Sequence, residues 1–333
     1  MLRWGVLSTA KIGIEQVIPG ILLADNGVLN AIASRDEAKA KAVAERFGIP
    51  HTFGTYDDLL ASDLVDAVYI PLPTSHHAEW AAKAARTGKH VLCEKPISLQ
   101  ADQIDDIIAA RDESGKLVTE AFMVTYHPQW LKVRSLVAEG AIGTLQQVQA
   151  AFTYYNVDPN NMRNVAELGG GALPDIGVYP VVATRFVTGA EATRASASIR
   201  WDEIFGTDVH ASFRADFGDF ELSAYVATQM ALRQEVAFHG DNGWIKVASP
   251  FNAGLYDADT VTLYAADRAQ AETFRFAGVH QYRLQAEAVA RAIESGDHTG
   301  GGEIFSLESS KKNQQLIDAI YRAGKSGQWE DVG

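Results

Sequence analysis

The sequence predicts an α/β Rossmann domain with a doubly wound parallel sheet, followed by an α+β domain with a large, open and mainly antiparallel sheet. In the first third, short apolar stretches alternate with stretches of helical spacing, which is typical of a parallel sheet covered on both faces. After about Ala121, apolar and polar residues alternate over strand-length segments, which indicates an antiparallel sheet with one covered face. We therefore predict a Rossmann domain over residues 1–121 and an α+β domain over residues 122–333.

In the first domain, strands and helices are expected to alternate with short links. The expected strands are Arg3–Ser8, Val28–Ala33, Ala67–Ile70, His90–Cys93 and Leu117–Glu120. The expected helices are Ile12–Ala24, Glu37–Phe47, Ala78–Thr87 and Ala101–Ser114, two of them closed by Gly48 and Gly88.

In the second domain, strands are expected first and two helices last. Period-two alternation predicts strands at 148–154, 209–215, 222–226, 236–238, 244–247, 260–264 and 273–276. Tyr282–Ser295 and Leu307–Ala323 are the expected helices, with Ser306 as the N-cap of the second.

Composition narrows the function classes. The 333 residues are 47% hydrophobic and 21% charged, which is typical of a globular protein. The net charge of −13 disfavours nucleic acid and anionic membranes as partners. A single cysteine, Cys93, allows no intrachain disulfide, and we see no leader and no membrane-spanning run. We expect a cytoplasmic protein.

The stretch WGVLSTAKIG occupies the place of a dinucleotide-binding fingerprint. Ser8, Ala10 and Gly13 stand at the three glycine positions. The first two are small, and the N–H groups of the following helix suit a phosphate. A plain strand–turn–helix explains this stretch equally well.

The end of the second strand favours NADP over NAD. An NAD site needs a carboxylate there for the ribose 2′-hydroxyl, whereas this chain has Ser34 followed by Arg35, which suit a 2′-phosphate. Asp36 is expected to point away. Lys39 fits either a cofactor contact or a solvated helix position.

Two later stretches carry candidate catalytic groups. Lys95 follows a buried strand and precedes Pro96, which favours an extended backbone, although a lysine there can also be simply solvated. Asp175 and Tyr179, four apart after three glycines, would share a helix face. A tyrosine beside a lysine can act as acid and base, and the alternative is a buried tyrosine bonded to a helix-capping aspartate. His76 and His77 are adjacent, without a Cys/His cluster, so no metal is expected.

Together these motifs resemble the glucose–fructose oxidoreductase/inositol dehydrogenase/rhizopine catabolism (Gfo/Idh/MocA) family. The matching stretches are WGVLSTAKIG, SRD, PTSHHAEWAAKAARTGKHVLCEKP, EAFMVTYHPQ and LGGGALPDIGVYPV, in family order over about the first 180 residues. The resemblance is greatest to the branch of dimeric dihydrodiol dehydrogenases and NADP-dependent D-xylose dehydrogenases, which carries tyrosine at the Tyr179 position. The departures are Ser8 and Ala10 for glycine, and Thr74 where many relatives have asparagine.

The resemblance implies roles for individual residues. Lys95 would contact the nicotinamide ribose and the substrate, Asp175 would bind substrate, and Tyr179 would be the acid and base. Arg163 matches a position near the substrate pocket. The cofactor would contact Ser8, Thr9, Ala10, Lys11, Ile12, Ser34, Arg35, Leu72, Pro73, Thr74, His77, Glu94 and Lys95.

The sequence thus predicts an NADP-dependent dehydrogenase acting on CH–OH groups of a sugar, polyol or cyclic diol, such as a D-xylose-type aldose or a trans-dihydrodiol. The alternatives are an NADPH-dependent reductase of a dicarbonyl or keto sugar and a non-catalytic NADP-binding regulator. The family's fold implies a homodimer, or a dimer of dimers, through the second domain's open sheet face.

Overall fold

The computed structural model describes residues 1–267, 270–300 and 302–333. The chain folds into two compact units. The first comprises Met1–Tyr126 and His280–Lys311, and the second His127–Val279 and Lys312–Gly333. This division differs from the predicted one at residue 121, because a segment near the C-terminus belongs to the first unit.

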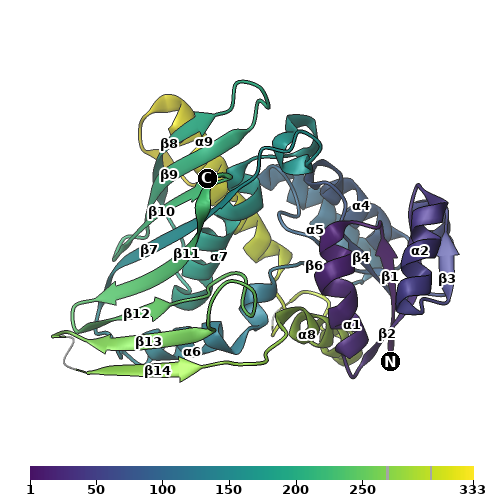
Figure 1. The fold of residues 1–333 in the computed structure, drawn as a ribbon, viewed down its shortest axis with the longest axis horizontal. Coiled ribbons are helices and arrows are strands. Elements are labelled where there is room, and N and C mark those ends of the chain that lie inside the picture. The colour runs from purple at the N-terminus through teal and green to yellow at the C-terminus, as the bar shows by residue number, and fades with distance from the viewer. Residues whose placement is uncertain (268–269, 301) are drawn as a thin grey trace. The chain divides into compact units, whose positions relative to one another are not determined.

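The first unit is built on a parallel sheet of six strands in the order β3-β2-β1-β4-β5-β6 (Figure 1). The strands are β1 (Leu2–Leu7), β2 (Gly27–Ala33), β3 (His51–Phe53), β4 (Ala67–Ile70), β5 (His90–Cys93) and β6 (Val118–Glu120). Strand order reverses at β1, which is the topology of a dinucleotide-binding Rossmann fold. The predicted fold class is confirmed, and only β3 had no counterpart among the expected strands.

Helices cover this sheet on both faces. They are α1 (Ile18–Leu23), preceded by a π-helical turn (Gly13–Val17), α2 (Glu37–Phe47), α3 (Tyr56–Ala61), α4 (His77–Arg86), α5 (Ile104–Ser114) and α8 (Gln281–Ser295). The apolar sides of the strands and helices form one core, in which Cys93 is fully buried. Burial raises the pKa of the Cys93 thiol, so it stays protonated and unreactive.

Helix α8 packs against α1 inside the first unit. Gly20 makes this approach possible, because a β-carbon there would lie 2.9 Å from the carbonyl carbon of Tyr282. The prediction placed this helix in the second domain since it follows the antiparallel strands in sequence, and order along the chain does not reveal its partner.

The second unit contains a nine-stranded sheet in the order β14-β13-β12-β11-β7-β10-β9-β8-β15. Its strands are β7 (Leu145–Tyr155), β8 (Arg194–Trp201), β9 (Asp208–Asp216), β10 (Glu221–Ala227), β11 (Gln229–Gly240), β12 (Gly243–Val247), β13 (Thr260–Ala265), β14 (Ala271–Arg275) and β15 (Glu330–Asp331). All pairs are antiparallel except β10 with β7, which confirms a mainly antiparallel sheet.

Helices α6 (Pro128–Ala138) and α7 (Val178–Thr188) belong to this unit, as does α9 (Leu307–Ser326) from Lys312 onward. Helices α6 and α7 pack on the sheet, and neither was assigned from the sequence. Nearly every residue of α7 is buried, so the polar stripe that marks a surface helix is missing. The N-cap predicted for α9 is confirmed, since Ser306 Oγ accepts a hydrogen bond from Ser309 N at 3.2 Å.

Candidate active site

The loop after β1 holds a strained serine. Ser8 has φ of +129°, and it is the one non-glycine residue with positive φ in the described ranges. Its Oγ donates to the Pro71 carbonyl at 3.2 Å and accepts from Ala10 N at 3.2 Å. A serine therefore occupies the first fingerprint position with the backbone conformation usually left to glycine.

The helix after this loop presents free N–H groups. Its first hydrogen bond runs from Ile14 N to the Ala10 carbonyl at 3.1 Å, so the amides of Lys11, Ile12 and Gly13 have no partner within the helix. Such a terminus suits a pyrophosphate. A β-carbon on Gly13 would only reach ordinary contact with Tyr69, at 3.5 Å, so close packing does not require this glycine.

The loop after β2 keeps its carboxylate occupied. Asp36 caps α2, accepting from Lys39 N at 3.2 Å, and Ser34 Oγ accepts from Asp36 N at 3.1 Å. Lys39 Nζ also lies 3.7 Å from Asp36 Oδ2. Arg35 is exposed beside Tyr56. The guanidinium of Arg35 is therefore accessible to a ligand, whereas the carboxylate of Asp36 is already bonded to the start of α2. These two properties suit a 2′-phosphate.

His77 joins the loops after β4 and β5. It is fully buried, with Nε2 2.6 Å from the Leu72 carbonyl and Nδ1 2.7 Å from the Pro96 carbonyl. Burial lowers its pKa to about 4. Because both ring nitrogens face backbone, His77 fixes the two loops instead of offering a nitrogen to a ligand. Thr74, which is also predicted to contact the cofactor, is buried at the start of the turn that leads into α4.

Two buried carboxylates hold the backbone on either side of Lys95. Glu94 accepts from Lys95 N at 3.3 Å and from the Tyr69 hydroxyl at 2.6 Å. Glu120, at the end of β6, accepts from Ile97 N at 3.0 Å. The Lys95–Pro96 bond between them is cis. Lys95 is therefore held at the carboxyl edge of the sheet. The sequence reading missed Tyr69 and Glu120, although both stand at or near strand ends.

In the second unit, the three glycines have separate structural reasons. Gly169 ends a short helical turn at φ +78°. A β-carbon on Gly170 would lie 2.5 Å from the Arg163 carbonyl, and one on Gly171 (φ +138°) would clash with Asp208. Asp208 accepts from Leu173 N at 2.7 Å, so it caps the helix that carries the candidate catalytic residues. The capping acid here is Asp208, which the sequence reading did not single out.

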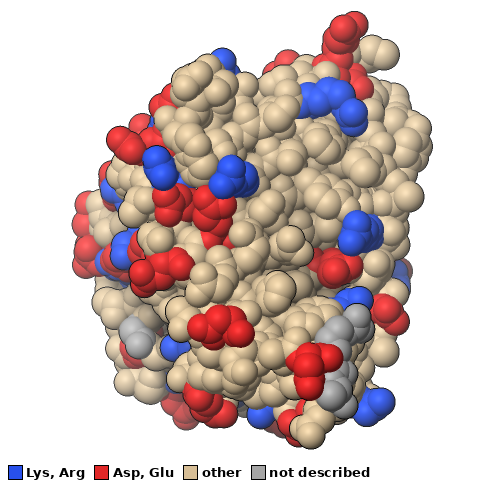
Figure 2. All heavy atoms as spheres, turned by 90° about the vertical axis from the view of Figure 1, so that its left-hand side faces the viewer, with Lys and Arg blue, Asp and Glu red and all other residues tan. Residues whose placement is uncertain are grey.

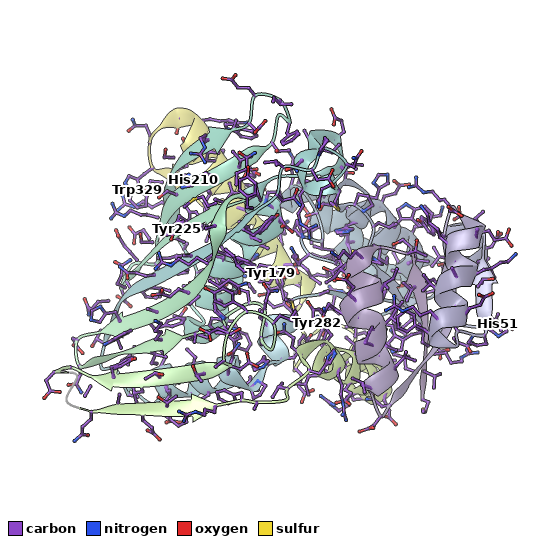
Figure 3. All side chains as sticks on the ribbon, viewed as in Figure 1. His51, Tyr179, His210, Tyr225, Tyr282 and Trp329 are labelled. Atoms are coloured by element: carbon purple, nitrogen blue, oxygen red, sulfur yellow. The ribbon has the colours of Figure 1, made fainter. Side chains whose placement is uncertain are left out.

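Asp175 accepts hydrogen bonds from Tyr154 and Arg163. The Tyr154 hydroxyl lies 2.7 Å and Arg163 Nε 2.8 Å from the same oxygen, Oδ2. Tyr179 lies one turn further on, packed against the rings of Phe152 and Phe251 and only 5% exposed (Figure 3). The predicted trio of Arg163, Asp175 and Tyr179 is therefore brought together within one unit. The Asp175 charge raises the pKa of Arg163, which stays cationic.

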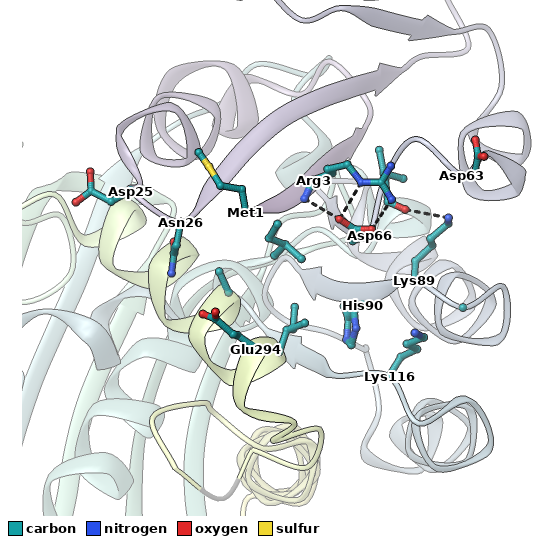
Figure 4. A pocket seen from close by; sticks show the side chains of 15 residues that line it. Met1, Arg3, Asp25, Asn26, Asp63, Asp66, Lys89, His90, Lys116 and Glu294 are labelled. Carbon is teal, nitrogen blue, oxygen red and sulfur yellow. Dashed lines mark hydrogen bonds and ion pairs between the residues drawn. The ribbon is translucent and has the colours of Figure 1, made fainter.

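A surface pocket of about 720 Å³ lies elsewhere in the first unit, near the start of β1 and β5 (Figure 4). Two of its cationic side chains are already paired: Arg3 binds Asp66 at 2.6 Å, and Lys89 Nζ donates to the Ser62 and Val65 carbonyls. Ligands of open α/β sheets bind at the carboxyl ends of strands, so we assign this pocket no role.

Other site types find no support in the described ranges. No group of three or more His, Cys, Asp or Glu residues there could hold a metal ion. None of the helices in the same ranges has both the length and the apolar character to cross a membrane.

Family models match both parts of the chain. The model for the oxidoreductase family with an NAD-binding Rossmann fold matches residues 2–122, and the GFO/IDH/MocA C-terminal domain matches residues 130–246. The chain belongs to the GFO/IDH/MocA family. It is an NAD(P)-dependent oxidoreductase of that family, which confirms the resemblance stated from the sequence.

Members of the family that resemble this chain differ in activity. An uncharacterized oxidoreductase from Rhizobium meliloti is 42% identical over 100% of this chain and 99% of its own length. The D-xylose 1-dehydrogenase (NADP(+)) 2 of Haloferax volcanii is 34% identical, with 98% of each chain covered. A crystal structure of a 3-ketoreductase from Actinomadura kijaniata, in complex with NADP and TDP-benzene, has a TM-score of 0.89 at 32% identity and 97% coverage of both chains.

Proposed function

We propose that this protein is an NADP-dependent dehydrogenase that oxidises a CH–OH group of a sugar or polyol, with a cyclic diol as the other substrate class. The observation that carries the proposal is the fixed backbone at Lys95, held from both sides by Glu94 and Glu120. These two hydrogen bonds fix the backbone around Lys95 and therefore the direction in which its side chain leaves the edge of the sheet. The similarity to an NADP-dependent D-xylose dehydrogenase supports the same reaction.

The first unit has the features that NADP needs. The amides following Ser8 suit the pyrophosphate, and exposed Arg35 beside Ser34 suits the 2′-phosphate. The proposed cofactor-binding residues are Ser8, Thr9, Ala10, Lys11, Ile12, Ser34, Arg35, Leu72, Pro73, Thr74, His77, Glu94 and Lys95. Among them, His77 would act through the loops that it joins.

The proposed chemistry divides between a lysine and a tyrosine. Tyr179 accepts the proton of the substrate hydroxyl, while Lys95 stabilises the phenolate and orients that hydroxyl. Asp175 and Arg163 bind the substrate. When bound, NADP⁺ supplies the acceptor for the hydride that leaves the same carbon, so the alcohol becomes a carbonyl and one proton remains on the protein.

A screen of aldoses, dihydrodiols and deoxyosones, followed by NADPH absorbance, tests the activity. Lys95→Ala is expected to lower kcat/KM by about 10³-fold or more, and Tyr179→Phe by about 10²–10⁴-fold, the usual range for a positioned acid/base. Lys41→Ala, an exposed lysine on α2, is the control. Near-wild-type turnover of Lys95→Ala would refute the assignment.

Cofactor selection has its own test. Arg35→Ala is expected to raise the Kd for NADP about 10- to 100-fold and to change that for NAD less than about threefold, because only NADP carries the phosphate. Arg46→Ala, on the last turn of α2, is the matched control. An equal increase in the Kd for NADP and for NAD would show that Arg35 does not recognise the 2′-phosphate.

A reductase is the second candidate, favoured by the structural similarity to a 3-ketoreductase. It predicts faster NADPH oxidation with keto or dicarbonyl sugars than NADP reduction with the matching alcohols. NADP binding without turnover in either direction would instead support a non-catalytic regulator.

We further propose a homodimer formed through the open face of the nine-stranded sheet. On this side Figure 2 shows a broad uncharged area among scattered charges. Side chains opposite the helix-covered core, such as Tyr225, Trp244 and Tyr264, are only partly buried, and the last two stack at 4.1 Å. Light scattering of wild type and Tyr225→Arg tests the interface, and an unchanged mass would exclude this face.

A further inference from the structure

Asp208 binds two segments of the second unit that lie far apart in the sequence. It is the first residue of β9, and only 1% of its surface is exposed. Oδ2 accepts a hydrogen bond from Leu173 N at 2.7 Å, and Oδ1 accepts one from the Tyr321 hydroxyl on α9, also at 2.7 Å. Asp208 therefore connects the first turn of the helix that carries Asp175 and Tyr179 with helix α9.

The same carboxylate also supports the loop before this turn. A β-carbon on Gly171 would clash with Asp208 Oδ1, so only glycine fits against the carboxylate at this point. Asp175 N in turn donates to the Gly171 carbonyl at 3.3 Å. The backbone is thus fixed on both sides of Asp175, at Gly171 before it and at Leu173 in the turn.

Tyr321 is itself held in place by the packing of α9. Its ring centroid lies 6.0 Å from that of Trp201. Gly324, three residues further along α9, packs against Ile199 of β8, where a β-carbon on the glycine would clash with the isoleucine side chain. Burial and the charge of Asp208 raise the pKa of Tyr321, so its hydroxyl remains a donor. A closely packed helix therefore supplies the second hydrogen bond to Asp208.

A helix start does not by itself require this arrangement. Asn or Ser caps a helix with a neutral side chain, whereas a buried carboxylate is costly unless donors surround it. Among the described residues, no Lys or Arg forms an ion pair with Asp208, so hydrogen-bond donors such as the Leu173 amide and the Tyr321 hydroxyl stabilise its charge. The donor from α9 makes the position of the turn depend on a distant part of the unit.

The geometry of this turn decides where the following side chains point. Leu173–Gly177 is π-helical, and Tyr179 follows directly in α7. An α-helical turn in its place would rotate the later side chains by about 100°. The direction of Tyr179 therefore depends on how the start of the turn is held.

We propose that Asp208 and Tyr321 are positioning residues of the candidate active site, which fix the turn that carries Asp175 and thereby the direction of Tyr179. Both act through the backbone of this turn and not by contact with the substrate. Misplacing a reacting group by about 1 Å lowers a rate by up to about 100-fold, so loosening the turn should reduce turnover without weakening the nucleotide-binding unit. The inference rests on the proposed function and adds two residues outside the stretches that carry the family resemblance.

Substitutions of Asp208 separate positioning from simple loss of the side chain. Asp208→Ala is expected to lower kcat/KM about 10- to 100-fold and to change the Kd for NADP less than about twofold. Asp208→Asn should restore kcat/KM to within about fivefold of wild type, because its amide oxygen accepts from Leu173 N and its NH₂ group donates to the Tyr321 oxygen.

The pH profile provides a readout that a purely structural role would not move. Under the proposed function, the pH at which kcat/KM reaches half its maximum reports Tyr179 as the base. This pH should rise by about one pH unit in Asp208→Ala, because a displaced Tyr179 is stabilised less by the charge of Lys95, and it should stay near the wild-type value in Asp208→Asn.

Asp216→Ala is the matched control, because Asp216 ends the same strand and accepts from Gly218 N at 2.8 Å. Tyr321→Phe keeps the cap and removes one donor, so it should lower kcat/KM about 3- to 10-fold, and it keeps the test valid if Asp208→Ala does not fold. Wild-type kcat/KM in Tyr321→Phe and Asp208→Ala, or a loss that Asp216→Ala matches, would overturn the inference.

Hydrogen exchange of residues 171–179 tests the turn without any turnover. Their amides should exchange about 10- to 100-fold faster in Asp208→Ala than in wild type, and less than about threefold faster in Asp208→Asn. Unchanged exchange in Asp208→Ala would overturn the inference whatever the activity. Faster exchange in a protein whose wild type turns over none of the screened substrates would count against the proposed function alone.

Discussion

Replacing Ser8 by alanine should lower the free energy of unfolding more than replacing it by glycine. A non-glycine residue at positive φ is strained by about 1–3 kcal/mol, and Ser8 has φ of +129°. Its hydroxyl forms two hydrogen bonds, each contributing about 0.5–1.5 kcal/mol. Ser8→Ala keeps the strain and loses both bonds, so we expect it to lower the free energy of unfolding by about 1–3 kcal/mol.

Ser8→Gly loses the same bonds but releases the strain. Glycine also gives the unfolded chain more freedom, which costs about 0.5–1 kcal/mol. These contributions nearly cancel, so Ser8→Gly should lie within about 1 kcal/mol of wild type and be about 1–2 kcal/mol more stable than Ser8→Ala.

Urea unfolding of the cofactor-free protein, followed by fluorescence and circular dichroism, measures the difference. Ser114, at the end of α5, supplies an inverted control: in a helix, glycine is less stable than alanine by about 0.5–1 kcal/mol. If Ser8→Ala proved as stable as Ser8→Gly, the strain argument would be refuted.

Two further stability effects follow from packing and protonation. Gly20→Ala should lower the free energy of unfolding, because overpacking against the Tyr282 backbone costs about 1–3 kcal/mol. This cost exceeds the gain of up to about 1 kcal/mol in helix propensity. Urea unfolding measures the effect, and Gly54→Ala, with open space around the added β-carbon, is the control. His127 Nδ1 accepts from Gln129 N at the start of α6, and burial lowers its pKa to about 4. The unfolded chain therefore binds the extra proton first, so the contribution of His127 to stability should be constant above about pH 6.5 and fall by up to about 3 kcal/mol as the pH drops to 4. His127→Asn keeps a capping side chain and should make the loss of stability between pH 6.5 and 4 smaller by that amount in unfolding titrations, and an unchanged slope would count against a contribution from His127.

The sequence predicted best where one local signal suffices. Ala67–Ile70 and His90–Cys93 were placed at their observed bounds because continuous apolar runs mark strands buried on both faces. Helix α2 was also placed at its observed bounds, where Gly48 adopts the left-handed conformation that ends it.

The residues that were missed act over long sequence separations. Glu120 holds Ile97, and Tyr154 holds Asp175, through contacts that no local pattern reveals. Asp208 stands 35 residues from Leu173, whose amide it caps. Each is a polar residue within a strand that looks ordinary in the sequence. For Arg163, the family resemblance supplied the position and the geometry supplied its partner.

The return of α8 to the first unit has a consequence for how the protein is made. On the ribosome, the first 126 residues emerge long before the helix at Gln281–Ser295 that packs against α1. The apolar surface of α1 that α8 covers therefore stays exposed until most of the polypeptide has been synthesised. A fragment ending at residue 126 should thus expose the surface around Gly20 and aggregate, whereas tethering residues 280–311 to it by a flexible linker should restore a soluble nucleotide-binding unit.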